Sequence, residues 1–360
     1  MSTYSEQVRI VSYVNSASGS LSLLGSLTII YVLMNSKSRL DTCHRRLVFG
    51  MSLADVISSS IFALCLVPRP TQLACSIQGF LLHIGVSTTP MYNASLCIYY
   101  VASVFFEKNE VWIRKKLEPF LHLIPILLNL CAAIFLVTSG TINEAGPVCW
   151  VASKPLDCLE DPNVECERGI KAAQYRYIFI GYQTFINFFV IVVSMIMLCC
   201  KVAKQERKMS ETNVVGRFSD TTTMEDDEEM PSGQIRMSVT ADAYRNPTRT
   251  RSQKRKVVKQ ASVYVAAYFL PFLFPSVHYI YKSFAGRRSF ALWITMSFFL
   301  PLQGLFNAMV FLRPRIAALR QKHEDVSSLK LFLATIKVID LDKSKSRKNN
   351  VSWQLEANSF

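Results

Sequence analysis

Seven long apolar stretches dominate this sequence and limit what the chain can fold into. A helix needs about 20 mostly apolar residues to cross the hydrocarbon core of a bilayer. Seven segments meet this length, at roughly 11–34, 47–67, 76–106, 120–139, 173–200, 257–281 and 290–312. None shows the ten-residue alternating pattern of a membrane β-barrel strand. The sequence therefore predicts an all-α bundle of seven transmembrane helices.

The composition agrees with a membrane protein and excludes several other classes. Half of the residues are hydrophobic and 18% are charged, whereas a soluble domain carries about 25% charged residues. This excludes a soluble enzyme, a disordered chain and a small disulfide-rich secreted domain. The basic residues lie between the apolar spans and not along one stripe, so no nucleic-acid partner is expected.

The distribution of basic residues predicts the orientation. With the N-terminus outside, 31 of the 40 Lys and Arg residues fall on the cytoplasmic side, as the positive-inside rule requires. Residues 1–10 are then a short extracellular leader and residues 313–360 a cytoplasmic tail. The first span is too long for a cleaved signal peptide and is interpreted as a retained anchor. A multi-pass protein of the plasma membrane is expected.

Four of the ten cysteines fall in outer segments, where disulfides persist. They are Cys75, at the start of the third span, and Cys149, Cys158 and Cys166, in the loop 140–172. Four cysteines allow three pairings. We favour Cys75–Cys149, which ties the long loop to the third helix, with Cys158–Cys166 closing a small ring.

The two largest cytoplasmic segments differ in character. Loop 201–256 has no apolar periodicity and carries an acidic run at 225–229 and a basic cluster at 249–256, a composition typical of disorder. Its Ser and Thr residues, notably Ser252, and those of the tail are candidate targets of kinases. The tail begins with apolar residues that alternate with basic ones, which predicts a helix along the inner membrane surface.

Several motifs resemble those of a known receptor class. Seven helices, a Cys at the top of the third and a Cys in the second outer loop together resemble G-protein-coupled receptors. The segments LVFGMSLADVISS, WIRKKLEPFLHLIPIL, PVCWV and GLFNAMVFLRPR are similar to the cyclic-AMP-receptor-like receptors of slime moulds and their protist and fungal relatives. These receptors are similar over the membrane core to the secretin/adhesion type. The resemblance covers roughly residues 10–320 and implies a receptor that binds a small extracellular ligand and activates a heterotrimeric G protein.

Two departures disfavour the rhodopsin-type class. The inner end of the third span reads Phe105-Phe106-Glu107-Lys108, without the Asp/Glu-Arg-Tyr motif. In the seventh span Asn307 is followed by Ala308, without the Asn-Pro-x-x-Tyr motif. The resemblance to cyclic-AMP receptors does not by itself identify the ligand.

Asp55 is the only carboxylate well inside a span. Ionisable groups within the bilayer are costly and are functional candidates by default. Asp55 could pair with Asn307 or bind a cation, and change partners as the bundle switches. The alternative is a hydrogen-bonded Asp with a purely structural role.

A second set of polar residues lies in the outer half of the bundle. The predicted outer segments are too short to form a folded domain, so we expect a ligand to enter the bundle itself. His83 and Ser87 are one turn apart and share a helix face. Each residue alone also fits a packing or helix–helix hydrogen-bonding role. The candidate pocket comprises His83, Ser87, Tyr92, Tyr182, Gln183, Asn187, His278 and Tyr279.

Pro271 and Pro275 should kink the sixth helix, because each lacks an N–H group. The resemblance implies that this kink is a hinge through which the inner face opens.

The inner face offers a candidate surface for the G protein. An apolar pair precedes a basic run in the second inner loop, and further basic residues flank the sixth and seventh spans. The alternative is that these cations only anchor the chain to anionic lipid. The set is Trp112, Ile113, Arg114, Lys115, Lys116, Lys254, Arg255, Lys256, Arg313 and Arg315.

Other functional classes lack support in the sequence. The seventh span contains no lysine for a retinal Schiff base, and the five histidines are scattered, which disfavours a zinc site. No nucleophile triad or phosphate-binding loop occurs, so we expect no enzyme, cofactor or metal. A small-molecule or ion transporter is the alternative, although the internal repeats typical of transporters are not evident.

Overall fold

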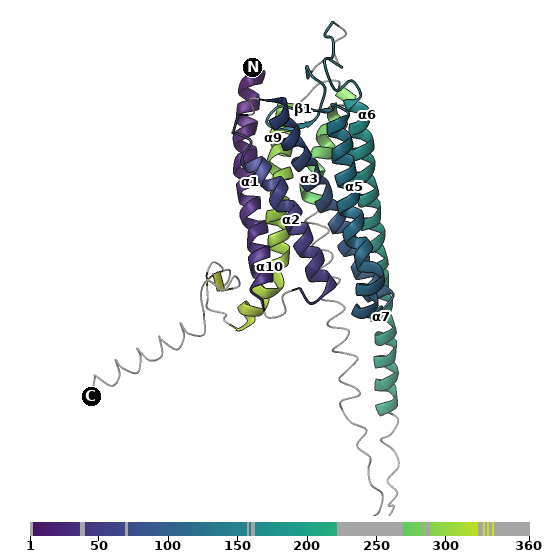
Figure 1. Ribbon diagram of the computed structural model, residues 1–360. Coiled ribbons are helices and arrows are strands. Elements are labelled where there is room, and N and C mark those ends of the chain that lie inside the picture. Colours follow the sequence, from purple (N-terminus) through teal and green to yellow (C-terminus); the bar gives the residue numbers. More distant parts are fainter. Residues whose placement is uncertain are drawn as a thin grey trace, which may run out of the picture.

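The chain folds into a bundle of helices that run side by side (Figure 1). This computed structural model describes residues 3–36, 40–68, 71–156, 158–159, 163–221, 269–282, 284–285 and 289–322, with a few positions between 327 and 334. In chain order the elements are α1 (Tyr4–Met34), α2 (Cys43–Ala63), α3 (Gln72–Tyr100), π-helix η1 (Val101–Phe105), α4 (Glu110–Trp112), π-helix η2 (Ile113–Leu117), α5 (Glu118–Thr138), β1 (Ile142–Glu144), β2 (Cys149–Val151), α6 (Ala172–Arg176), π-helix η3 (Tyr177–Tyr182), α7 (Gln183–Thr221), α9 (Phe290–Phe299), 3₁₀-helix η4 (Leu300–Leu302) and α10 (Gln303–Lys322).

These elements form seven helical rods within the described residues, because several of them run on without a break. The rods are α1, α2, α3–η1, α4–η2–α5, α6–η3–α7, the helical residues 269–282, and α9–η4–α10. Five helices of the described part are long and apolar enough to cross a membrane. The predicted all-α class is confirmed.

Three helices run further than the predicted spans. α1 begins at Tyr4, so most of the predicted leader is helical. α7 continues to Thr221, because the residues after 200 include many good helix formers. The rest of the predicted loop, including Ser252, lies outside the described residues. α10 continues through Pro314 to Lys322, so the predicted surface helix starts as an extension of the seventh rod.

The bundle has two distinct ends. The outer end, predicted extracellular, holds Tyr4 and the hairpin β1–β2, and the inner end holds the start of α2 and the end of α10 (Figure 1). The two strands pair antiparallel, with Asn143 opposite Trp150. The third helix, α3, packs against α2, α5 and α7. α3 is therefore the central rod.

The hairpin is tied to the outer end of α3. A disulfide joins Cys75 of α3 to Cys149 of β2, and the backbone N–H of Cys149 donates to Oε1 of Gln78 at 2.8 Å. A second disulfide joins Cys158 and Cys166. This is the pairing favoured from the sequence.

Small residues bring α1, α2 and α10 into close contact. The backbone N–H of Gly304 donates to Oγ of Ser22 at 2.9 Å, and Oγ of Ser59 donates to the same oxygen at 2.9 Å. A Cβ atom on Gly25 would lie 2.8 Å from Cα of Leu305. Such small residues let membrane helices approach closely, where dispersion and hydrogen bonds replace the hydrophobic effect.

This contact predicts that Gly304→Ala destabilises the protein. The new Cβ would lie 2.0 Å from Oγ of Ser26 and 2.9 Å from the carbonyl oxygen of Ser22, so the helices must separate. We expect the free energy of unfolding to fall by about 1–3 kcal/mol. The measurement is thermal unfolding of purified protein, followed with a dye that reacts with the buried thiols of Cys43, Cys65 and Cys97.

Gly181→Ala is the matched control, because the nearest atom to its new Cβ lies 3.8 Å away. This variant should unfold at the wild-type temperature or slightly above it. Equal stability of the Gly304 and Gly181 variants would refute the role of this contact.

Candidate functional site

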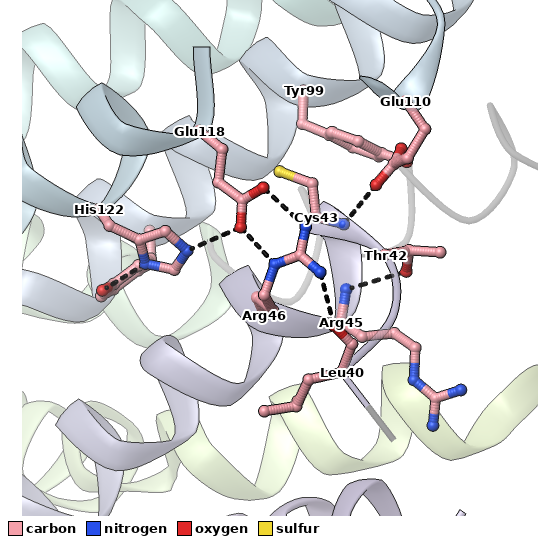
Figure 2. Close-up of polar contacts among 10 residues, drawn as sticks. Leu40, Thr42, Cys43, Arg45, Arg46, Tyr99, Glu110, Glu118 and His122 are labelled. Carbon is pink, nitrogen blue, oxygen red and sulfur yellow. Dashed lines mark hydrogen bonds and ion pairs between the residues drawn. The ribbon is translucent and has the colours of Figure 1, made fainter. Parts of the chain in front are cut away.

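An ion pair joins α2 to α5 at the inner end of the bundle (Figure 2). Arg46 lies in the first turn of α2, which Thr42 caps by accepting from the N–H of Arg45 at 3.4 Å. Nη2 of Arg46 donates to Oε2 of Glu118 at 2.7 Å, and Nε donates to Oε1. The Glu118 side chain is only 10% exposed. The two-point geometry fixes both orientation and distance.

The ion pair extends into a chain of polar contacts with α3. Nε2 of His122 lies 3.8 Å from Oε1 of Glu118, one turn along the same helix. The hydroxyl oxygen of Tyr92 lies 3.1 Å from Nδ1 of His122. A Cβ on Gly50 would lie 2.7 Å from that hydroxyl oxygen, so Tyr92 occupies a fitted site against α2. Three rods are thus linked at this end.

The position of Tyr92 corrects a sequence expectation. We placed Tyr92 with the outer pocket, but its hydroxyl group contacts His122. Tyr92 lies nine residues after His83 on α3, about 14 Å further inward at 1.5 Å per residue. It therefore belongs to the inner network.

A second acidic residue holds the second inner loop in place. Glu110 begins α4, and its carboxylate accepts from the backbone N–H of Cys43 and from the hydroxyl of Tyr99 at 3.3 Å (Figure 2). The side chain of Asn109 caps the same turn by accepting from the N–H of Trp112 at 2.8 Å. The loop between α3 and α5 is thus tied to both α2 and α3. Neither Glu110 nor Glu118 was singled out from the sequence.

This fixed loop presents a basic edge beside the exposed ring of Trp112. Arg114, Lys115 and Lys116 are exposed, and Nζ of Lys108 lies 5.3 Å from the centre of the Trp112 ring. On α10, Arg313 is exposed. A partner at the inner end would meet these side chains first.

Two members of the predicted inner surface are placed differently. Ile113 is 0% exposed and belongs to the apolar core of the inner half, because it lies on the side of η2 that packs against the bundle. Arg315 is half-buried, with its guanidinium carbon 5.3 Å from the centre of the Phe311 ring. Lys254, Arg255 and Lys256 lie outside the described residues.

A buried carboxylate links three rods near the middle of the bundle. Oδ2 of Asp55 accepts from Nδ2 of Asn307 at 2.8 Å, and Oδ1 accepts from Oγ1 of Thr89 at 2.8 Å. Asp55 and Asn307 are each 1% exposed. Pairing with Asn307 is one of the two arrangements expected from the sequence, whereas Thr89 was not anticipated.

The outer half of the bundle contains buried polar groups without hydrogen-bond partners. His83 is 0% exposed, and neither of its ring nitrogens has a partner among the described residues. The amide nitrogen of the buried Asn187 also has none there. Buried polar groups in proteins are nearly always paired. Within the described part of the chain, His83 and Asn187 depart from this rule.

A neighbouring glutamine ties three rods together beside these groups. Nε2 of Gln183 donates to the carbonyl oxygen of Ser87 at 3.1 Å and to Oδ1 of Asn129 at 2.9 Å. Gln183 thus connects α7 to α3 and α5. Asn129 lies within an apolar span, and its polarity was the only sequence signal for it.

Two tyrosines expected in the pocket face outward. Tyr182 is 63% exposed and Tyr279 is 43% exposed. Adjacent helical residues point in different directions, and the neighbours Gln183 and His278 are turned towards the bundle. The pocket candidates that remain on the inside are His83, Ser87, Gln183, Asn187 and His278.

The sixth rod contains both predicted kink residues. Pro271 and Pro275 are buried within the helical residues 269–282, and the ring of Phe274 stacks on Phe299 of α9 with centres 4.4 Å apart. The residues before 269 lie outside the described part of the chain. A hinge at these prolines stays a prediction.

The ion pair predicts a large cost for Glu118→Gln. The amide removes the negative charge and leaves Arg46 without its counter-ion, so we expect the free energy of unfolding to fall by about 2–3 kcal/mol. This is less than the 3–5 kcal/mol of a fully buried pair, because Arg46 keeps some contact with solvent. Thermal unfolding of the purified protein measures it.

Glu167→Gln is the control, because its partner Lys154 lies 3.9 Å away with both side chains more than half exposed. That change should cost less than about 1 kcal/mol. The ion pair would lose its assigned role if both variants unfolded at the same temperature.

Comparison with known proteins shows the fold of the chain but no family. No family model and no curated protein matches it. Among solved structures it is similar to squid rhodopsin, with a TM-score of 0.63 over 97% of this chain and 92% of that chain. The two sequences are 13% identical. The protein has the seven-helix fold of rhodopsin, a G-protein-coupled receptor fold.

Proposed function

We propose that this chain is a G-protein-coupled receptor of the plasma membrane that binds a small extracellular ligand within the bundle and activates a heterotrimeric G protein. The observation that carries the proposal is the exposed basic edge Arg114–Lys116. It lies on a loop fixed by Glu110, at the inner end of a rhodopsin-like bundle.

The chemistry of this edge suits a protein partner. Three adjacent cations beside the exposed Trp112 ring would complement a surface that is both acidic and apolar. The loop is held by hydrogen bonds to α2 and α3, so little conformational freedom is lost when a partner binds. A docking loop that is ordered in advance binds at lower entropic cost.

The ligand site that we propose lies in the outer half, around His83 and Asn187. Their nitrogens have no hydrogen-bond partner among the described residues, which favours a ligand that carries hydrogen-bonding groups. Ser87, Gln183 and His278 complete the set.

The buried carboxylate offers a route between the two ends. On α3, Thr89 lies six residues inward of His83, about 9 Å at 1.5 Å per residue. Thr89 contacts Asp55 of α2, and α2 carries Arg46 near its inner end. A shift of α3 on ligand binding would therefore act on the helix that holds the inner network. Asp55 is proposed as the switch residue, with Asn307 as the partner that it releases.

The finer assignment rests on the sequence motifs. Their similarity to the cyclic-AMP-receptor-like group supports a receptor of that type, and the structural likeness to rhodopsin is compatible with any group that shares the fold. Kinases acting on the third inner loop and the tail are a further proposal, which rests on the sequence alone.

Reversal of Arg114, Lys115 and Lys116 to Glu should abolish G-protein activation. Cells that express the protein together with a set of G-protein activation sensors are first treated with nucleotides and small metabolites, to find a compound that activates a G protein. The active compound is then applied to the triple variant, whose surface level and topology are checked with antibodies. We expect compound binding to persist while activation is lost, because the partner surface has changed sign.

Arg9→Glu is the control, since this exposed residue lies on α1 at the opposite, outer end of the bundle. Full activation by the correctly inserted triple variant would reduce these residues to lipid anchors. Transport of the active compound into vesicles, without nucleotide exchange on any G protein, would favour the transporter.

Asp55→Asn should leave the protein folded and change its signalling. The amide can still accept from Asn307, and the Thr89 hydroxyl can turn to accept from the new amide, because it also donates to the carbonyl oxygen of Gly85 at 3.3 Å. The lost charge weakens both bonds. A change of about 1 kcal/mol between the two states alters their ratio about fivefold.

The readout is basal and compound-stimulated activation at equal surface level. Ser52→Ala is the control, since the Ser52 hydroxyl donates to the carbonyl oxygen of Val48 in its own helix at 2.8 Å and the change leaves the charge of Asp55 and its two partners in place. If Asp55→Asn signalled as the wild type does, Asp55 would be a structural residue.

A further inference from the structure

A groove with a charged end runs between α1 and α10, and of the residues in the sites described above it includes only Arg313. Its volume is ≈ 680 Å³, within the range of about 300–1,000 Å³ that holds small molecules. Its lining residues recur every three or four positions on each helix, so one face of each helix forms a wall. They are Leu21, Leu24, Gly25, Thr28, Leu305, Ala308, Met309, Leu312, Arg313, Ile316, Ala317 and Arg320.

The walls of this groove are apolar over most of their length. Leu24 and Met309 are 63% and 51% exposed, as expected for side chains that face hydrocarbon. The Thr28 hydroxyl donates to the carbonyl oxygen of Leu24 at 2.7 Å, so its hydrogen is already used. A Cβ on Gly25 would lie 2.8 Å from Cα of Leu305, so the two helix backbones are in close contact along the outer part of the groove.

The inner end of the groove carries two positive charges. Arg313 and Arg320 both line it and are both exposed, and among the described residues that line it none is acidic. The described residues show no ion pair for Arg313. Guanidinium groups bind phosphate oxygens in a two-point geometry. The charge of this end therefore complements an anionic headgroup.

The apolar length of the groove fits within one leaflet of a membrane. From Leu305 to Arg313 the helix advances eight residues, about 12 Å at 1.5 Å per residue, and Pro314 follows. Half of the hydrocarbon core is about 15 Å thick. An acyl chain that lies against Leu305 and Leu312 would place its headgroup at the two arginines.

We propose that this groove is a binding site for one anionic phospholipid of the inner leaflet. The acyl chain lies along the apolar walls, and the phosphate is held by Arg313 and Arg320. Basic pockets between membrane helices on the cytoplasmic side are a known way of binding lipid headgroups. This inference does not depend on the proposed receptor function.

Native mass spectrometry of the full chain tests the site. The protein is extracted from bilayers of phosphatidylcholine that contain a minor fraction of phosphatidylinositol 4-phosphate. The lipid that stays bound is identified from the mass that it adds to the protein. We expect one phosphoinositide per chain and little retained phosphatidylcholine. Replacing Arg313 and Arg320 with Gln should weaken binding about fivefold for each arginine, roughly 25-fold together.

Two further variants separate a built site from general charge. Ala317 lies one helical turn from each arginine, so Ala317→Trp keeps both charges but fills the space between them. This variant should also lose the bound phosphoinositide. Ala317 is exposed, so the variant should fold, and thermal unfolding checks this. Lys115→Gln with Lys116→Gln removes the same charge from the inner end outside the groove and should retain the lipid within about twofold.

Three results would overturn the proposal. Equal losses in the arginine and lysine variants would mean general attraction to an anionic surface. Equal retention of the two lipids by the wild type would mean that charge plays no part. A dimer that Ala317→Trp breaks, with no change in bound lipid, would make a second copy of the chain the occupant.

Discussion

A polar side chain inside a bilayer has no water to bond, so it turns into the bundle, where it can bond a neighbouring helix or the backbone of its own helix. This constraint decides which face of each rod points inward. α3 carries Thr88, Thr89 and Asn93, all buried, and it is surrounded by α2, α5 and α7. On α1, the serines and glycines face α2 and α10, where Ser22 accepts hydrogen bonds from both helices. The apolar faces that remain lie outward, where Leu24 and Phe185 are more than half exposed.

The two ends of the bundle are fixed by different chemistry. At the outer end the disulfide Cys75–Cys149 and the Gln78 hydrogen bond hold the hairpin over α3. At the inner end no disulfide is seen among the described residues, and hydrogen bonds between charged groups hold the helices together instead. The Arg46–Glu118 pair and the Glu110 contacts hold α2, α3 and α5 together. Covalent bonds cannot rearrange during signalling, whereas charged hydrogen bonds can exchange partners.

Hydropathy predicts the rods well, because crossing a membrane demands apolar length. The orientation of each rod about its own axis is harder to predict. Tyr182 and Gln183 are adjacent and both polar, yet only Gln183 turns inward. The sequence pattern does not single out Glu118, because this residue lies at the start of a helix. Charged residues are common there, where a helix meets a loop. Ile113 looked like part of an exposed loop, but it is buried against the inner core. Such outcomes depend on the positions of neighbouring rods, which a single sequence does not reveal.

The connections of α2 suggest how the two ends communicate. This helix contributes Asp55 to the buried layer and Arg46 to the inner network, and nine residues place the two about 14 Å apart on one rigid rod. On α3, Thr89 contacts Asp55 directly, whereas Tyr92 is linked to Arg46 only through His122 and Glu118. Under the proposed function, a small sliding of α3 against α2 would therefore strain the Asp55 contacts directly and the inner network indirectly. Because close-packed helices have few alternative arrangements, such strain is relieved by exchange of hydrogen-bond partners. The inner end would then change in discrete steps.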